Sequence, residues 1–391
     1  MTTAPVLPDV PPLAGFTVGV TAARRADELG AMLQRRGATV QHAPALRIVP
    51  LADDTQLLAA TRELIAQPPD ITVATTGIGF RGWIDAANGW GVGEELMAAL
   101  GAGELIARGP KARGAIRASG LTDAWSPPSE SSAEVLEHLL ARGVEGARIA
   151  VQLHGEPLPD VVEALCVAGA DVVEVPVYRW MPPVDIAPVD RLLDAVVAGG
   201  IDVVAFTSAP AAASLLARAK ERRLLDDLLQ ALRGPVLALC VGPVTAAPLE
   251  AVDVPTVQPQ RSRLGAMVRR LETEMPARAR RLPVAGHWLE LRGQAALVDG
   301  ELRAVAPACM AMLRVLARRP GRVVTRAELL GSLPGAGVDE HAVETAMTRL
   351  RAALGEPKLV QTVVKRGYRL ALDPAAGPVP VGGHCLYGDV R

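Results

Sequence analysis

Two stretches of this sequence decide the fold, because their sequences align with each other: FTVGVTAARRADELGAMLQRRGATVQHAP (16–44) and RIAVQLHGEPLPDVVEALCVAGADVVEVP (148–176). Each begins and ends with a short β-branched run, and a helical pattern lies between the two runs. Gly37 falls on Gly169, where a glycine suits the C-terminal cap of that helix. The shared pattern predicts strand, helix, strand in both stretches.

Two further blocks repeat in the same order. DITVATTG (70–77) lies over DVVAFTSA (202–209), and ARGPKARGAI (107–116) lies over CVGPVTAAPL (240–249) with one residue of slip. A repeat with a period of about 132 residues indicates a duplicated domain and not a solenoid. Read by itself, the repeat predicts two lobes that follow each other along the chain.

The strands of the repeat indicate parallel sheets. Val203–Phe206 is wholly apolar, and Val18–Val20 and Val172–Val175 are rich in valine. Such strands, alternating with helices, are typical of parallel sheets that are buried on both faces. We therefore predict that residues 13–262 form two doubly wound α/β lobes.

The pattern of predicted helices and strands changes after residue 262. A helix carrying Leu264 should stop at Pro276, so that 263–286 reads as a helix followed by a basic linker. Short β-like runs then occupy 287–305, with Asp299 and Gly300 as a hairpin signal. Helical patterns follow, and a β-rich run and a tail rich in Pro and Gly close the chain; these segments are 307–318, 325–332, 339–354, 359–372 and 374–391. We predict an α+β domain at 287–373.

The helical pattern at 339–354 has one apolar and one polar face. Val343, Met347, Leu350 and Leu354 form a single stripe at spacings of 4, 3 and 4. The other face carries small polar and basic residues, which suit base edges in the DNA major groove: His341, Thr345, Thr348 and Arg349, with Arg351 at its edge. The following hairpin presents further candidates for contacts to DNA, which are Lys365, Arg366, Tyr368 and Arg369.

Charge favours a nucleic-acid partner for this part of the chain. The whole chain has a net charge of −1, but residues 276–372 hold 16 basic and 8 acidic side chains. A charge split of this kind indicates that one end of the chain meets a polyanion. The alternative is a small α+β domain with a solvated arginine face.

The segment resembles the winged-helix effector domain of OmpR/PhoB-type response regulators. The matching pieces are LRVLARRPGRVVTRAELL (313–330), TRLRAALG (348–355) and TVVKRGYRL (362–370). The resemblance implies a loop at about 332–338, a recognition helix at 339–354 and a wing at 359–372. It also implies double-stranded DNA as the partner, and we expect a homodimer on repeated half-sites.

The paired turns of the repeat carry hydroxyl and Gly-Pro motifs after predicted strands. In open α/β sheets, ligands bind beyond the carboxyl ends of the strands, and free N–H groups at helix N-termini suit anions. The candidates are Thr75, Thr76, Thr207, Ser208, Gly242 and Thr245. The alternative is that these residues only cap helices and make turns.

Residues 13–262 as a whole resemble uroporphyrinogen-III synthase. The matching pieces are VVAFTSAPAAASLL (203–216), LALCVGPVTAAPLEA (237–251) and RIAVQLHGEPLPDVVEALCVAGADVVEVPVYRW (148–180). The resemblance implies that the chain crosses between lobes, with lobe 1 at about 13–44 plus 180–262 and lobe 2 at about 45–179.

That family closes hydroxymethylbilane, a linear tetrapyrrole with eight carboxylates, while inverting its last ring, and it uses no metal or cofactor. The resemblance makes Tyr178 a candidate general acid for the departing hydroxyl. A departure puts catalysis in doubt, because Thr21 is followed by Ala22 and Ala23, where the family often has Arg.

Three functions are compatible with this architecture. The first is a transcription regulator whose synthase-like lobes sense a tetrapyrrole precursor or a small anion, which resembles actinobacterial regulators of nitrate and nitrite assimilation. The second is a working synthase with a DNA-binding domain. The third is a plain synthase with an inert C-terminal module.

Other features point to the cytoplasm. The four cysteines lie far apart and form no C-x-x-C motif, which argues against a disulfide framework or a zinc site. The N-terminus lacks a basic start and an apolar core, so no signal peptide is expected. The apolar stretches near 195–218 are interrupted by Gly, Asp, Pro and Ser, which argues against a membrane span.

Overall fold

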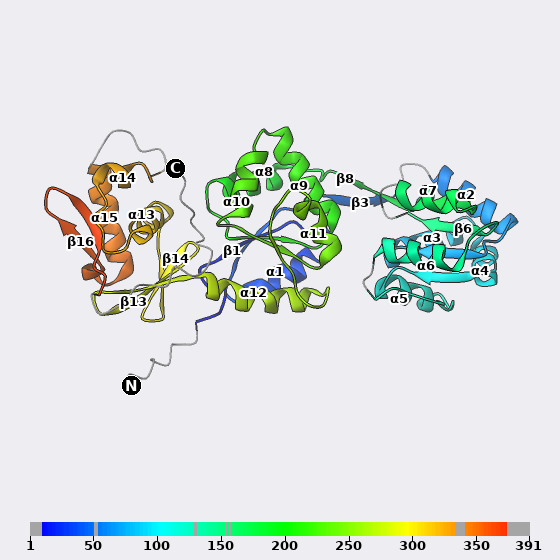
Figure 1. Cartoon of the computed structure of the whole chain (residues 1–391), viewed down its shortest axis with the longest axis horizontal. Helices are drawn as coiled ribbons and strands as arrows, with labels where there is room; N and C mark the ends of the chain where they lie inside the picture. The colour runs from blue at the N-terminus through cyan, green and yellow to red at the C-terminus, as the bar shows by residue number, and fades with distance from the viewer. Residues whose placement is uncertain are drawn as a thin grey trace. The chain divides into compact units, whose positions relative to one another are not determined.

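The computed structural model describes residues 10–50, 54–128, 131–153, 155, 158–333 and 341–373 (Figure 1). The chain divides into two compact units. One is Arg47–Pro182, which we call lobe 2, and the other is made of the described residues before and after it. This other unit contains lobe 1, around the first sheet, and a C-terminal domain that begins at Arg280.

Lobe 1 is a five-stranded sheet in the order β11-β10-β9-β1-β2, with every pair parallel. Its strands and helices are β1 (Thr17–Val20), α1 (Ala26–Gln34), β2 (Thr39–His42), α8 (Ala187–Val197), β9 (Val203–Phe206), α9 (Ala209–Glu221), α10 (Leu225–Arg233), β10 (Leu237–Cys240), α11 (Pro243–Glu250), β11 (Thr256–Val257) and α12 (Leu264–Arg278). Helices α1 and α12 cover one face of the sheet, and α8 to α11 cover the other (Figure 1). β9 and β10 are buried at every position, as a doubly wound sheet requires.

Lobe 2 is a four-stranded parallel sheet in the order β5-β4-β6-β7. Its elements are β3 (Arg47–Pro50), α2 (Thr55–Ala66), β4 (Ile71–Ala74), α3 (Gly77–Gly89), α4 (Gly93–Ala102), β5 (Glu104–Ala107), α5 (Pro110–Ala118), α6 (Ser132–Arg142), β6 (Arg148–Gln152), α7 (Pro159–Val167), β7 (Asp171–Val175) and β8 (Tyr178–Met181). β3 and β8 pair antiparallel and form the two chain connections of the lobe.

Strands at equivalent positions of the sequence repeat occupy the same places in the two sheets. β1 and β2 of lobe 1 stand where β6 and β7 stand in lobe 2, and β9 and β10 stand where β4 and β5 do. Each sheet therefore combines the first block of one repeat with the later blocks of the other. The lobes do not follow each other along the chain as the repeat alone predicts.

The C-terminal domain has a four-stranded antiparallel sheet, three helices and a hairpin around one core. Its elements are β12 (Arg280–Val284), β13 (His287–Arg292), β14 (Ala295–Val298), β15 (Glu301–Ala304), α13 (Pro307–Arg318), α14 (Arg326–Leu330), α15 (His341–Leu354), the 3₁₀ turn Pro357–Leu359, β16 (Val360–Val363) and β17 (Gly367–Leu370). Parallel α/β lobes followed by a winged helix are the predicted fold class.

The predicted basic linker is wrong, because residues 280–284 form β12. This strand pairs with β13 and buries Leu282 and Val284, while Arg281 lies over the ring of Trp288 at 4.6 Å. The arginines concealed the alternation of buried and exposed positions. Helix α12 also runs past Pro276 to Arg278, so this proline does not end the helix as the sequence predicts.

Two predicted segments fall outside the described residues. These are residues 334–340, which include most of the expected loop at 332–338 and the first two residues of the expected recognition helix, and the tail at 374–391. Within the described ranges no helix has both the length and the apolar character needed to cross a bilayer.

Glycines at equivalent places end α1 and α7. Gly37 has φ +91° and Gly169 has φ +88°, a backbone region that other residues enter only with strain. A Cβ at Gly37 would also lie 3.0 Å from the backbone nitrogen of Ala14. The repeat therefore conserves a chain reversal as well as its strands.

We predict that Gly37→Ala lowers the free energy of unfolding by about 1–3 kcal/mol, through backbone strain and the contact with Ala14. Urea unfolding of the full chain measures it. Gly89→Ala is the matched control, because a Cβ at the end of α3 meets nothing within 4 Å. An equal loss of unfolding free energy in Gly37→Ala and Gly89→Ala would contradict the conclusion that Gly37 is required by its backbone conformation.

Candidate ligand and nucleic-acid sites

In lobe 2 the structure brings together Thr75, Thr76 and Tyr178 around Gln152. The Thr75 hydroxyl donates to the main-chain carbonyl of Gln152 at 2.8 Å, and Thr76 Oγ1 lies 3.3 Å from Tyr178 Oη. Thr76 caps α3 by accepting from the Gly79 N–H, and Gln152 Nε2 donates to the same oxygen at 3.1 Å. The cluster lies where β4 and β6 end side by side.

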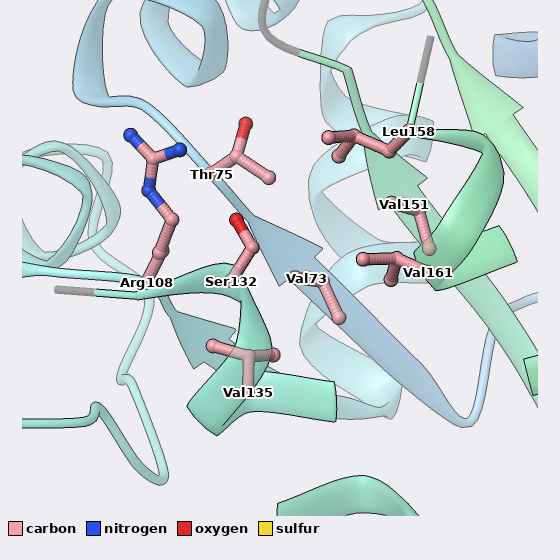
Figure 2. A pocket seen from close by; sticks show the side chains of 8 residues that line it. All are labelled: Val73, Thr75, Arg108, Ser132, Val135, Val151, Leu158 and Val161. Atoms are coloured by element: carbon pink, nitrogen blue, oxygen red, sulfur yellow. The ribbon is translucent and has the colours of Figure 1, made fainter. Parts of the chain in front are cut away.

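The ends of β4 and β6 are the topological switch point of this sheet, because the chain runs from β4 to one neighbour and reaches the other only later. A small open hollow lies there, lined by Val73, Thr75, Arg108, Ser132, Val135, Val151, Leu158 and Val161. Figure 2 shows Thr75, Arg108 and Ser132 at one side of the hollow, with the apolar side chains around the rest. Polar groups thus gather at the edge where ligands bind in such folds.

In lobe 1 the remaining candidates follow the neighbouring strands β9 and β10. Thr207 and Ser208 are partly exposed, and Ser208 begins α9 without capping it through its side chain. Gly242 begins α11 and leaves room for Ser262, whose Oγ would lie 2.4 Å from a Cβ there. Thr245 is buried in the first turn of α11. These four residues share one sheet edge.

Helix α15 separates its faces as the sequence predicts. Val343, Met347, Leu350 and Leu354 are buried in the domain core. The opposite face is exposed and carries His341, Thr345, Thr348 and Arg349. The Thr348 hydroxyl donates to the main-chain carbonyl of Glu344 at 3.0 Å. Arg349 has the longest side chain on the exposed face.

The hairpin β16–β17 presents a basic tip. Lys365 and Arg366 are exposed in its turn, and Arg369 is exposed on β17, where its Nε donates to Gln361 Oε1 at 3.1 Å. Val364, beside them, is also exposed. The tip has the length and charge needed to reach a phosphate backbone.

Two of the predicted DNA-contact residues, Arg351 and Tyr368, also make contacts inside the domain. Arg351 donates from Nε and Nη2 to the Val360 carbonyl at 3.0 and 2.8 Å, and from Nη2 to Thr362 Oγ1 at 2.9 Å. Tyr368 is only 4% exposed, and the guanidinium groups of Arg326 and Arg351 lie 5.5 and 5.7 Å from the centre of its ring. Both residues therefore join α15 to the wing, and their predicted contacts to DNA stay a prediction.

The C-terminal domain is joined to lobe 1 by the turn Arg292–Gln294, which we call the docking turn. The backbone N–H of Gln294 donates to the Gly15 carbonyl at 2.9 Å, and its side-chain amide donates to the Gly199 carbonyl at 3.0 Å. Arg314 of α13 donates to the carbonyls of Gly293 and Gly199, at 2.6 and 3.4 Å. The two domains therefore share a hydrogen-bonded interface.

A buried carboxylate lies under the docking turn. Asp202 accepts a hydrogen bond from the Thr17 N–H at 2.8 Å, and a Cβ on Gly293 would lie 2.3 Å from its Oδ2. Burial raises the pKa of Asp202 to about 6, against the opposing effects of the Thr17 N–H and the charge of Arg314. The folded protein thus binds this proton more tightly than the unfolded chain does.

Comparison with known proteins assigns both parts of the chain. Residues 27–269 match the family described as uroporphyrinogen-III synthase HemD, which is more than half of the chain. The chain belongs to the uroporphyrinogen-III synthase family. Residues 300–370 match a second family, described as transcriptional regulatory protein, C terminal. This uroporphyrinogen-III synthase family member therefore carries a response-regulator-type C-terminal domain.

Similar proteins cover the lobes or the C-terminal domain. Uroporphyrinogen III synthase from the extremely thermophilic bacterium Thermus thermophilus is 29% identical over 66% of this chain and 100% of its own, with a TM-score of 0.57. The uncharacterized protein YjjA of Bacillus subtilis is 28% identical over 66% of this chain and 94% of its own. The RstA DNA-binding domain of Klebsiella pneumoniae, in complex with the RstA box, is 28% identical over 24% of this chain and 97% of its own, with a TM-score of 0.21.

Sequence reasoning missed Gln152 and the docking turn. Gln152 ends a strand that is otherwise apolar, and a single polar residue at a strand end gives no clear signal. Gln294 and Arg314 lie in ordinary turn and helix patterns, and only the tertiary structure brings them to Gly199. The repeat did hold one clue, because Gln152 stands where the first stretch has Val20.

We predict that Asp202→Asn makes the protein more stable than the wild type at pH 8, and that this advantage shrinks as the pH falls through about 6 and disappears only near the unfolded pKa of 3.8. The wild type gains stability on acidification because the folded pKa, about 6, lies above the unfolded value, while asparagine does not titrate. Its amide oxygen still accepts from Thr17.

Urea unfolding at a series of pH values measures this difference. Asp226→Asn, on the exposed surface of α10, is the control. A difference between Asp202→Asn and wild type that does not vary with pH would contradict the buried, titrating carboxylate.

Proposed function

We propose that the protein is a DNA-binding transcriptional regulator in which α15 enters the major groove and the wing contacts the backbone. The observation that carries the proposal is the exposed His/Thr/Arg face of α15, held over a buried apolar stripe. Arg can pair bidentately with guanine, and Thr can reach base edges through its hydroxyl or methyl. The net positive charge of residues 276–372 supports the same reading.

We infer that the synthase-like lobes act as the sensor, with a tetrapyrrole precursor or a small anion as effector. The docking turn supports this role, since a change in lobe 1 reaches the C-terminal domain through Gly15, Gly199 and Asp202. The target genes we propose are those of nitrate and nitrite assimilation in an actinobacterial cytoplasm. Assimilatory nitrite reductases use siroheme, which derives from uroporphyrinogen III.

A homodimer on repeated half-sites is part of the proposal. A single winged helix reads a short site, and symmetric pairing of two copies doubles the recognised length. Footprinting a promoter with and without effector measures the site length and the response together.

We predict that Arg349→Ala weakens specific DNA binding by about 1–3 kcal/mol and relaxes base preference, because it removes a bidentate base contact. Fluorescence anisotropy with a footprinted promoter fragment measures affinity. Arg269→Ala, exposed on α12, is the matched control. If affinity and base preference both survive in Arg349→Ala, the docking of α15 in the groove is wrong.

The second candidate function is a bifunctional synthase, favoured by the contact between Thr76 and Tyr178 in lobe 2. Hydroxymethylbilane left alone closes mainly to the type I isomer. A working enzyme gives a clear excess of type III, and chromatographic separation of the oxidised products measures the ratio. A ratio equal to that of the spontaneous reaction would leave the regulator as the function.

A further inference from the structure

The wing is a short structure that needs support from the rest of its domain. β16 and β17 have four residues each and form a two-stranded sheet. A two-stranded hairpin by itself is marginally stable in water. The order of the basic tip therefore depends on contacts between the hairpin and its neighbours.

One support is the loop before α14. Val324 and Tyr368 exchange two main-chain hydrogen bonds, at 2.8 and 2.9 Å. The approach is close, because a Cβ at Gly367, which has φ +132°, would lie 2.0 Å from the Val324 carbonyl oxygen. This support fixes the base of β17, so β16 is the outer strand of the wing.

Arg351 of α15 supports the outer strand. The Ala371 N–H donates to the Leu359 carbonyl at 3.0 Å, so these two residues form a hydrogen-bonded pair. The next pair, Val360 and Leu370, is then not hydrogen-bonded, and the Val360 carbonyl points away from β17. Arg351 donates to this carbonyl from both Nε and Nη2. The guanidinium fills a hydrogen-bonding position that β17 cannot fill.

The same guanidinium contacts both strands of the wing. Thr362 and Tyr368 lie directly opposite each other in the hairpin. Arg351 Nη2 donates to Thr362 Oγ1 at 2.9 Å, and the guanidinium lies 5.7 Å from the centre of the Tyr368 ring. On α14, Arg326 lies 5.5 Å from that ring and pairs with Glu344 of α15 at 3.5 Å. The wing, α14 and α15 therefore meet at Tyr368.

We propose that Arg351 is a positioning residue for DNA binding: it holds the wing at a fixed place beside α15, so that the basic tip reaches the phosphate backbone while Arg349 faces the bases. The tip consists of Lys365 and Arg366. The part of the proposal that concerns DNA rests on the proposed function of the C-terminal domain, whereas the support that Arg351 gives to the wing does not.

The contacts of Arg351 require an arginine. A guanidinium offers its donors in a planar fork and can lie over an aromatic ring, whereas a lysine is a point charge on a flexible stem. The sequence predicts a different role, which is a direct contact between Arg351 and DNA. A lysine would keep much of a contact to phosphate, because it keeps the charge. The two roles therefore give different outcomes for Arg351→Lys.

The first test is hydrogen exchange of the free full chain. We expect Arg351→Met and Arg351→Lys to raise the exchange rate of amides in residues 359–372 by about tenfold, because hydrogen bonds from a charged donor stabilise a local structure by roughly that factor. Arg349→Met is the matched control, because it removes an exposed guanidinium from the same helix, and it should leave the exchange of the wing unchanged.

Three outcomes of this test would overturn the support of the wing by Arg351. The first is wild-type exchange in Arg351→Met. The second is wild-type exchange in Arg351→Lys, which would show that the fork is not needed. The third is an equal increase throughout the C-terminal domain, since the loss must be confined to the wing.

The second test is a double-mutant cycle on DNA binding. Fluorescence anisotropy with the footprinted promoter fragment measures affinity, and Arg351→Met should weaken binding about tenfold. In Lys365→Ala/Arg366→Ala the tip no longer contacts the backbone. Adding Arg351→Met to that variant should weaken binding by less than about twofold, because Arg351 acts through the tip.

The cycle separates support of the wing from direct contact with DNA. A tenfold loss on adding Arg351→Met to both backgrounds would overturn the positioning role, since Arg351 would then contact DNA itself. A changed base preference in Arg351→Met would overturn it as well, because contacts to phosphate carry no base preference. If the wild type binds no DNA, the proposed function fails, and hydrogen exchange still decides whether Arg351 supports the wing.

Discussion

The parallel pairing of β1 with β9 is the constraint on which the arrangement of the chain depends. It places Val18 beside Val203, so lobe 1 is built from segments far apart in sequence. Both strands are apolar and need helices over both faces, and α1 and α12 on one side and α8 to α11 on the other provide them. The chain must therefore leave after Leu46 and return at Pro183, and it does so through β3 and β8, which pair as an antiparallel ribbon.

The same constraint explains why a duplicated sequence gives two unequal sites. Each sheet has one switch point, between β4 and β6 in lobe 2 and between β9 and β1 in lobe 1. Each of the two lobes therefore has a sheet edge where the strands end and the N-termini of the helices that follow them. In lobe 2 the polar Gln152 lies beside Gly79, whereas the equivalent positions of lobe 1 are Val20 and Ala211, although Thr207, Ser208 and Thr245 keep that edge polar as well. Duplication preserved the backbone, and the side chains diverged.

Patterns that depend on one element could be predicted from the sequence, and contacts between elements could not. Helix 307–318 and the stripe of α15 follow from periodicity alone. β12 was missed because Arg280, Arg281 and Pro283 hide the alternation that buries Leu282 and Val284. Arg351 and Tyr368 lie where a DNA contact was expected, but the wing folds back on them, and no local pattern records that contact. Thr75, Thr76 and Tyr178 were found from their motifs, whereas Gln152, which bonds to Thr75 and Thr76, was hidden in a buried strand.

The position of the docking turn bears on how lobe 1, as the proposed sensor, could control DNA binding by the C-terminal domain. Asp202 and Thr17 lie at the amino ends of β9 and β1, under the docking turn, while Thr207 and Ser208 lie at the carboxyl end of β9. One buried four-residue strand, about 13 Å long, separates them. Close-packed protein interiors have low compressibility and transmit strain. Under the proposed sensor function, a ligand at Thr207 that binds two positions of β9 with different affinity would shift the contact between Asp202 and the docking turn.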